Sequence, residues 1–168
     1  ILRNLSGHEG CRVKTVAEVS LERRQYVSSH YPDVDVTDNF VSLLDDSEIT
    51  ALVIATPAGT HYELAKAALN AGKHVLVEKP LALNTRDADE LVDLADKHSK
   101  VLMVGHTYLY YPVLQTLKNV IDDGVIGDTF YFNLNRLNLG IARTDVNAWW
   151  NLAPHDVSIL LYLRDGKM

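Results

Sequence analysis

The sequence predicts an α/β protein built on a parallel sheet, because two kinds of segment alternate along the chain. Three segments are nearly continuous apolar runs: "ALVIAT" (51–56), "HVLVEK" (74–79) and "VLMVGH" (101–106). Runs of this length without polar alternation are typical of strands that are buried on both faces, as in a parallel sheet. The stretches between them carry apolar residues at helical spacing. Strand, helix, strand, helix, strand is the order of a doubly wound α/β sheet.

Both intervening helices are predicted from a one-sided apolar face. The apolar positions are Leu64, Ala65, Ala68 and Leu69 in 60–72, and Ala88, Leu91, Val92 and Ala95 in 84–100. Gly72 is well placed to end the first helix. In the second helix the acids come early and the lysines late, as the helix dipole favours.

Further elements are expected on either side of this core. They are the last turn of a helix in 1–10, strands in 11–19 and 33–37, and helices in 20–30, 39–45 and 111–124. The helical start at residue 1 suggests a chain that begins within a domain. In "TFYFNLNRLNL" (129–139) apolar and polar residues alternate, which is typical of a half-exposed antiparallel strand. We therefore predict two domains, an incomplete nucleotide-binding domain in 1–126 and the beginning of an α/β domain with an antiparallel sheet in 127–168.

Composition narrows the class of partner. Hydrophobic residues make up 47% of the 168 residues and charged residues 23%, the balance of a globular protein. The net charge of −6 argues against nucleic-acid binding. No apolar run approaches the roughly 20 residues of a membrane span, and the N-terminus has no signal-peptide pattern. Cys11 is the only cysteine and the histidines are scattered, so we expect no disulfide, no catalytic metal and a cytoplasmic location.

Polar groups follow each of four predicted strands. They are Glu18, then Thr56 with Pro57, then Glu78 with Lys79, and finally His106. Strand ends are often polar simply because the backbone turns into water there. In an open parallel sheet, however, these ends share one edge, and ligands bind at that edge. The sequence therefore predicts a ligand site there.

Glu18 indicates which cofactor this edge could hold. An acid at the end of the second strand of such a fold can accept hydrogen bonds from the ribose hydroxyls of NAD and would repel the 2′-phosphate of NADP. The alternative is a solvated glutamate at the start of the next helix. No G-x-G-x-x-G sequence is present to bind the pyrophosphate.

Lys79 and His155 are the candidates for chemistry. Lys79 precedes Pro80, which pushes its backbone toward extended geometry and holds its ammonium near the strand end. Around His155, apolar spacing predicts a helix with Asn151 as N-cap and Pro154 in the first turn. The positive end of a helix disfavours imidazolium, so His155 could act as a base near neutral pH. The alternatives are a surface lysine without a chemical role and a buried histidine.

Three segments resemble the glucose–fructose oxidoreductase, inositol dehydrogenase and rhizopine-catabolism (Gfo/Idh/MocA) family. "ATPAGTHYELAKAALNAGKHVLVEKPLAL" (55–83) looks like the family's core with its E-K-P motif. "VGHTYLYYPVLQTLKNVIDDGVIGD" (104–128) is similar to the helix that links its two domains. "DVNAWWNLAPHDVSIL" (145–160) looks like the second-domain motif around the catalytic histidine.

The resemblance implies a Rossmann domain followed by an α/β domain, and NAD(P)-dependent oxidation of sugars, cyclitols or nucleotide sugars. It implies that Lys79 positions the substrate hydroxyl and the nicotinamide and that His155 is the acid/base. We expect NAD rather than NADP, and a homo-oligomer. The expected cofactor contacts are Glu18, Thr56, Pro57, His61, Glu78, Lys79 and His106, and the expected substrate contacts are Lys79, Asn151 and His155. The segments "GHTYLYYP", "RLNLG" and "WNLAPHD" are most similar to the corresponding segments of bacterial family members linked to nucleotide-sugar metabolism.

The sequence departs from the family pattern in three places. The first strand and its glycine loop are absent, Asn151 replaces an acid four residues before the histidine, and most of the second domain's sheet would lie beyond Met168. An amide can orient a neighbour but cannot carry a proton. The alternative to the enzyme is therefore a truncated, non-catalytic α/β module that no longer binds a dinucleotide.

Overall fold

The structure is a computed structural model that describes residues 1–136 and 147–165. The strands are Thr15–Ala17 (β1), Asp35–Thr37 (β2), Ala51–Ile54 (β3), His74–Val77 (β4) and Leu102–Val104 (β5). The α-helices are Leu2–Ser6 (α1), Leu21–His30 (α2), Val41–Asp45 (α3), His61–Asn70 (α4), Thr85–Lys97 (α5), Pro112–Asp122 (α6) and Ala148–Leu163 (α7). Two short 3-10 helices are Ala58–Thr60 (η1) and Thr107–Tyr110 (η2). The predicted α/β class is confirmed, and so is the predicted order of elements from residue 1 to α6.

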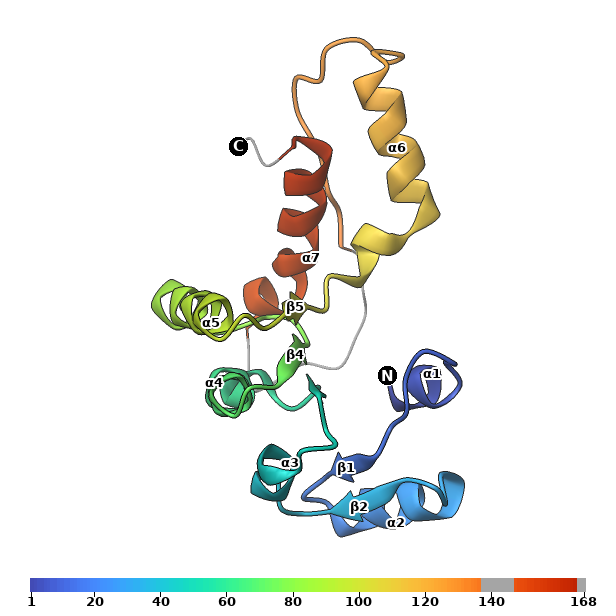
Figure 1. The fold of residues 1–168 in the computed structure, drawn as a ribbon. Coiled ribbons are helices and arrows are strands. Elements are labelled where there is room, and N and C mark those ends of the chain that lie inside the picture. Colours follow the sequence, from blue (N-terminus) through green and yellow to red (C-terminus); the bar gives the residue numbers. More distant parts are fainter. Residues whose placement is uncertain (137–146, 166–168) are drawn as a thin grey trace.

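All paired strands are parallel, as predicted, but they form two sheets. β1 pairs with β2, and β3, β4 and β5 pair in that order, with Leu52 opposite Val75 and Val75 opposite Leu102. Among the described residues no strand bridges β1 and β3, and this is why one continuous sheet does not form. Figure 1 shows β1 and β2 beside α2 and α3, below the layer that holds β4, α4 and α5.

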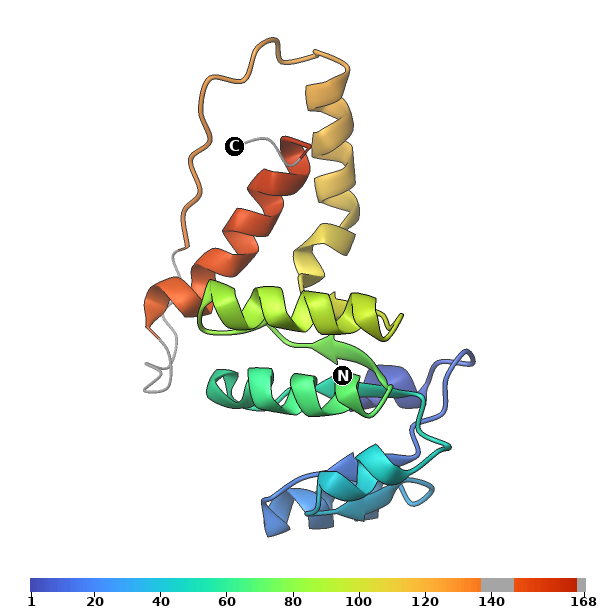
Figure 2. The ribbon, with the colours of Figure 1, turned by 60° about the vertical axis from the view of Figure 1, so that its left-hand side comes forward.

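The core lies on one face of the three-stranded sheet. Helices α4 and α5 run side by side there (Figure 2) and pack with the sheet around Leu69, Val77 and Leu91, which are fully buried. The opposite face is more open, since Val53 and Met103 are each 39% exposed. The prediction of strands buried on both faces is therefore wrong for β3, where exposed and buried residues alternate along the strand.

Local signals set several helix ends where they were predicted. The Asn84 side chain accepts a hydrogen bond from Asp87 N–H at the start of α5. Gly72 and Gly124 follow α4 and α6 with φ of +72° and +69°. These left-handed conformations favour glycine, because a β-carbon would clash with the backbone there.

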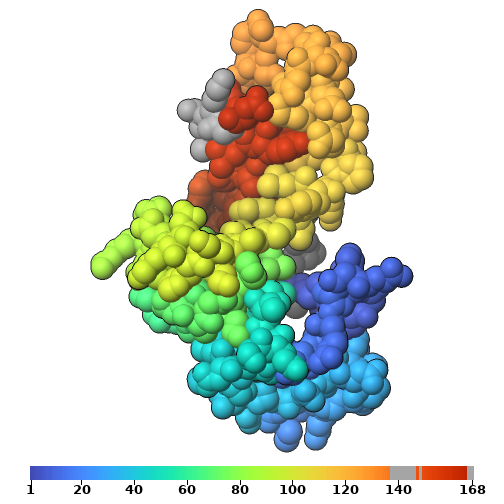
Figure 3. All heavy atoms as spheres, in the orientation of Figure 1, coloured from blue at the N-terminus to red at the C-terminus, as the bar shows by residue number. Residues whose placement is uncertain are grey.

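Helices α6 and α7 pack against each other on one side of the α/β layers and form an upper lobe in the space-filling view (Figure 3). The segment between them contradicts one prediction. Residues 129–136 contain no strand, and Phe130 and Tyr131 are 89% and 83% exposed. A strand needs a partner for its backbone hydrogen bonds, and no described strand pairs with this segment. Residues 137–139 lie outside the described part of the chain.

Candidate active site

The carboxyl ends of β1, β3 and β4 converge on one cavity of about 840 Å³. The predicted site residues on its wall are Glu18, Thr56, Pro57, His61, Glu78, Lys79 and Asn151. His106 and His155 do not line this cavity. The shared strand edge thus brings together most of the residues that the sequence singled out, and α7 adds Trp150 and Asn151 from the far end of the chain.

Lys79 links β4 to α7. Its ammonium donates hydrogen bonds to the backbone carbonyl of Asn151 at 2.6 Å and to the Asn151 side-chain oxygen at 3.3 Å. The side chain is half-buried at the strand end, in front of a cis peptide bond to Pro80. Asn151 therefore orients the lysine, which is the role open to an amide at this position.

Helix α7 begins one turn earlier than predicted. Its N-cap is Asn147, whose side chain accepts a hydrogen bond from Trp150 N–H at 3.0 Å, so the assignment of Asn151 as N-cap was wrong. Pro154 lies inside the helix and not in its first turn, and its nitrogen cannot donate to the Trp150 carbonyl. Asn151 and His155 remain one turn apart on the same side of the helix.

The pKa of His155 is lowered from its usual value, but not mainly for the predicted reason. The helix dipole acts within about one turn of a helix end, and His155 lies further along α7. Burial is the largest cause, and the positive charges of Lys79 and Arg136 lower the pKa further. Its Nδ1 is buried and bonds to no described residue. Desolvation and like charge thus favour a neutral imidazole.

His106 follows β5 and has similar surroundings. Burial lowers the pKa of its side chain, and its Nδ1 is also buried without a hydrogen bond to the described residues. Gly105, which precedes it, was not predicted as important. A β-carbon there would lie 3.0 Å from a carboxylate oxygen of Glu78, so the glycine leaves room for this acid.

His61 ties two of the strand ends together. The ring is 1% exposed, with Nδ1 2.7 Å from the Pro80 carbonyl and Nε2 2.8 Å from the Thr56 carbonyl. Both ring nitrogens therefore face the backbone of the protein. His61 supports the cavity wall by joining the loop after β3 to the loop after β4.

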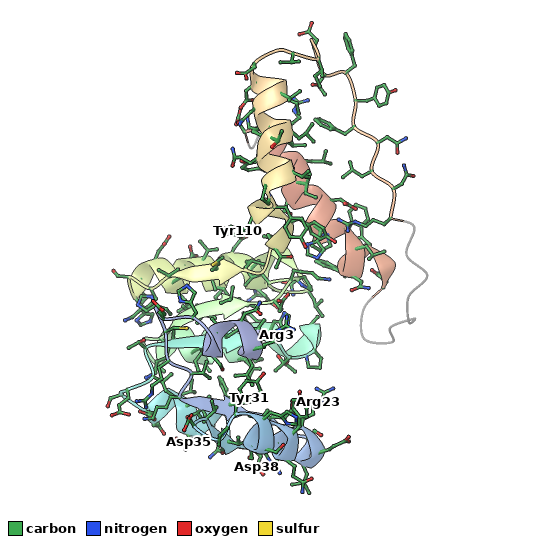
Figure 4. The ribbon with its side chains drawn as sticks, turned by 90° about the vertical axis from the view of Figure 1, so that its right-hand side faces the viewer. Arg3, Arg23, Tyr31, Asp35, Asp38 and Tyr110 are labelled. Carbon is green, nitrogen blue, oxygen red and sulfur yellow. The ribbon has the colours of Figure 1, made fainter. Side chains whose placement is uncertain are left out.

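Glu18 is held at the start of α2. One carboxylate oxygen accepts a hydrogen bond from Ser20 N–H at 2.9 Å, and the other lies 3.6 Å from the Arg23 guanidinium. Arg23 also lines the cavity, is 76% exposed and reaches out from α2 at the edge of the lower layer (Figure 4). The sequence analysis missed Arg23, although its place in the first turn of the helix that follows the strand-end acid Glu18 was a usable signal.

A second group of side chains, which does not line the cavity, includes a ring contact with His155. We call Tyr108, Arg136 and Asp156 the Arg136 cluster. Arg136 donates to one carboxylate oxygen of Asp156 from Nε at 2.9 Å and from Nη2 at 2.8 Å. This cluster could not be predicted from the sequence, because Asp156 and Tyr108 lie 20 and 28 residues from Arg136 and follow no common spacing.

Comparison with known proteins identifies the family to which this fold, with its ligand site at the carboxyl ends of the strands, belongs. Residues 2–106 match the model of the oxidoreductase family with an NAD-binding Rossmann fold, and the chain belongs to this Gfo/Idh/MocA family. It is 35% identical to the uncharacterized oxidoreductase YdgJ of Escherichia coli, covering 88% of this chain and 46% of that protein. It is 32% identical to the UDP-N-acetylglucosamine 3-dehydrogenase of Acidithiobacillus ferrooxidans, covering 99% and 49%.

The fold agrees with that family. The structure of the putative oxidoreductase yvaA from Bacillus subtilis superimposes with a TM-score of 0.82 at 26% identity, covering 95% of this chain and 46% of that one. The chain thus spans about half the length of the curated relatives it matches. No helix in 1–136 or 147–165 is long and apolar enough to cross a membrane, and no group of His, Cys, Asp and Glu in these ranges could hold a metal ion.

Proposed function

We propose that the protein is an NAD-dependent dehydrogenase that oxidises a secondary hydroxyl of a sugar, a cyclitol or, most specifically, a nucleotide sugar. The observation that carries this proposal is the link from Lys79 at the end of β4 to Asn151, one turn before His155 on α7. The link supports the proposal because the Lys79 ammonium lies at the edge where this fold binds its ligands, and His155, whose pKa is lowered mainly by burial, follows one turn further along α7.

The size of the cavity supports the proposal of a dinucleotide cofactor. Its volume of about 840 Å³ is within the range of cofactor sites, roughly 300–1,000 Å³. Glu18 would hold the ribose hydroxyls at one end, and Thr56, Pro57, Glu78 and Lys79 would contact the rest at the ends of β3 and β4. When bound, NAD supplies the hydride acceptor, and the protein supplies position and charge.

We assign a separate role in the reaction to each of His155, Lys79 and Asn151. Oxidation of a secondary alcohol requires that the hydroxyl proton be removed as hydride leaves the carbon. His155, held neutral by burial and nearby positive charge, accepts this proton. The Lys79 ammonium stabilises the negative charge that develops on the oxygen. Asn151 keeps the ammonium at the strand end until the substrate hydroxyl takes its place.

The support for a nucleotide sugar is a resemblance at the level of sequence. A relative named UDP-N-acetylglucosamine 3-dehydrogenase covers 99% of this chain. We further propose that residues 1–126 form the cofactor domain and that 127–168 begin the substrate domain. The homo-oligomer and the cytoplasmic location remain predictions.

A screen of nucleotide sugars, free sugars and cyclitols with NAD and NADP tests the proposal. The protein should be produced with the complete coding region of its gene. We expect reduced nicotinamide to form with at least one nucleotide sugar and to form faster with NAD. Failure to bind either dinucleotide in titration calorimetry would instead support the alternative, a non-catalytic α/β module.

A further inference from the structure

Three segments that are distant in the sequence meet at Arg136. Its Nε and Nη2 both donate to one oxygen of Asp156 on α7, and its Nη1 donates to the hydroxyl of Tyr108 in η2 at 3.3 Å. The ion pair is largely buried, with side-chain exposures of 24% for Arg136 and 21% for Asp156. Hydrogen bonds to Asp156 and Tyr108 raise the pKa of Arg136, so it remains a cation.

Tyr108 connects this ion pair to His155. The Arg136 guanidinium carbon lies 4.9 Å from the centroid of the Tyr108 ring. The Tyr108 ring in turn meets the His155 ring edge-on, with centroids 4.7 Å apart and an interplanar angle of 73°. Because Arg136 holds the tyrosine through both its ring and its hydroxyl, it fixes one wall of the histidine's surroundings.

We propose that Arg136 is a positioning residue for His155: it neutralises the carboxylate of Asp156, the residue that follows the histidine in α7, and holds Tyr108 against the imidazole. This inference rests on the proposed role of His155 as the base. Without the guanidinium, an uncompensated carboxylate would lie on the adjacent residue of α7. Such a charge favours imidazolium and would remove the neutral base.

The pKa of His155 depends on several other charged groups around it. The charged or titratable groups around it are Glu78 and Lys79 after β4, His106 after β5, Tyr108 in η2 and Arg136 in the segment before α7. Asp156 follows His155 in α7 and pairs with Arg136. Lys79, Arg136 and His106 lower the pKa of His155, and Glu78 raises it. The carboxylate that pairs with Arg136 belongs to Asp156, the residue directly after the histidine in α7.

The pKa of His155 can be measured directly, from the pH dependence of its ring proton in NMR spectra. Four variants are compared with the unmodified protein: Arg136→Gln, Asp156→Asn, the double variant, and Arg136→Lys. Arg136→Gln should raise the pKa of His155 by about 0.5–1 unit, because Asp156 loses its counter-charge. Asp156→Asn should lower it, because the guanidinium then stands alone.

The double variant is the matched control. It removes both charges but keeps side chains of similar size, so the pKa should return close to that of the unmodified protein. Arg136→Lys keeps the positive charge but loses the planar guanidinium with its paired N–H donors, and it should change the pKa of His155 less than Arg136→Gln does. A merely structural role predicts no opposite shifts and no recovery. Shifts of the same sign in both single variants, or none in either, would overturn the proposal.

This readout needs no turnover, so it can fail separately from the proposed function. If His155 is the base, the acid limb of kcat/KM against pH should also move to higher pH in Arg136→Gln. Opposite NMR shifts in a protein whose His155→Ala variant keeps full turnover would leave the electrostatic balance intact and refute the role of His155. Thermal unfolding of each variant identifies any that fail to fold.

Discussion

The ammonium of Lys79 and the backbone carbonyl of Asn151 are joined by a 2.6 Å hydrogen bond, although the two residues are 72 positions apart in the sequence. The bond connects the end of β4 to the first turn of α7. It therefore places the lysine of the E-K-P segment and the helix that carries His155 in one fixed relationship, on which the proposed chemistry depends.

Replacing Lys79 with alanine should lower kcat by about 10²-fold or more, since one preorganised group that stabilises a developing anion contributes on this order. Cofactor affinity should change much less. Lys66→Ala is a suitable control, because Lys66 on α4 pairs with Glu90 on α5 and lies outside the cavity. An equal loss of turnover in both variants would show that the effect of Lys79 is not specific.

The pH dependence of the reaction should reveal His155. Burial and positive neighbours lower the pKa of the folded histidine below its usual value of 6.5. The base must be deprotonated, so kcat/KM should stay constant as the pH falls to 6.5 and decline only below it. His155→Ala should abolish this limb and lower turnover by about 10²- to 10⁴-fold. A limb above 6.5 that persists in His155→Ala would assign it to another group.

Much of the fold could be predicted from the sequence, because strands and helices of this class follow from local patterns. The apolar runs and Gly72 each identified an element or its end. The predictions failed where a tertiary partner decides the outcome. Residues 129–136 alternate like a strand but pair with no described strand. The sequence around Pro154 suggested a helix start, but the Asn147 side chain caps α7 one turn earlier.

The candidate site divides in the same way. Glu18 and Lys79 could be identified because parallel topology places strand ends on one edge. The Arg136 cluster could not, since its contacts depend on how an irregular segment folds back onto α7. A hydrogen bond between residues 20 apart leaves no periodic trace in the sequence.

Cofactor choice should depend on Glu18. In a dehydrogenase with the proposed activity, NAD should be preferred, and Glu18→Ala should reduce the ratio of kcat/KM for NAD over NADP. The reason is that the carboxylate would repel a 2′-phosphate, whereas Arg23 at 3.6 Å would be released to attract it. The double variant Glu18→Ala, Arg23→Ala separates the two effects. Equal use of both cofactors by the unmodified protein would contradict the role of Glu18.

The cap of α7 can be tested through stability. Asn147→Ala should lower the free energy of unfolding by about 0.5–2 kcal/mol, the usual cost of losing an N-cap side chain. Asn151→Ala, a matched change inside the helix, removes no cap and should lower the free energy of unfolding by less. It also removes the hydrogen bond between the Asn151 side chain and Lys79. Urea denaturation of both variants measures the difference. A larger loss from Asn151→Ala would place the cap where the sequence first suggested it.

Gly105 offers a test of the space that the site requires. In Gly105→Ala the new β-carbon would lie 3.0 Å from one Glu78 carboxylate oxygen and 3.1 Å from its carboxyl carbon, so the acid must move. Glu78 precedes Lys79 and accepts a hydrogen bond from its backbone N–H at 3.3 Å, and a shift would disturb the lysine's strand end. We expect kcat to fall while the free energy of unfolding changes little, because the Glu78 carboxylate is the flexible end of a side chain and can move without disturbing the core.

Gly59→Ala is the control, since a β-carbon there meets no atom within 4 Å. Steady-state kinetics and urea denaturation of the two variants, measured side by side, decide the matter. Unchanged turnover in Gly105→Ala would mean that Glu78 can move without consequence for Lys79.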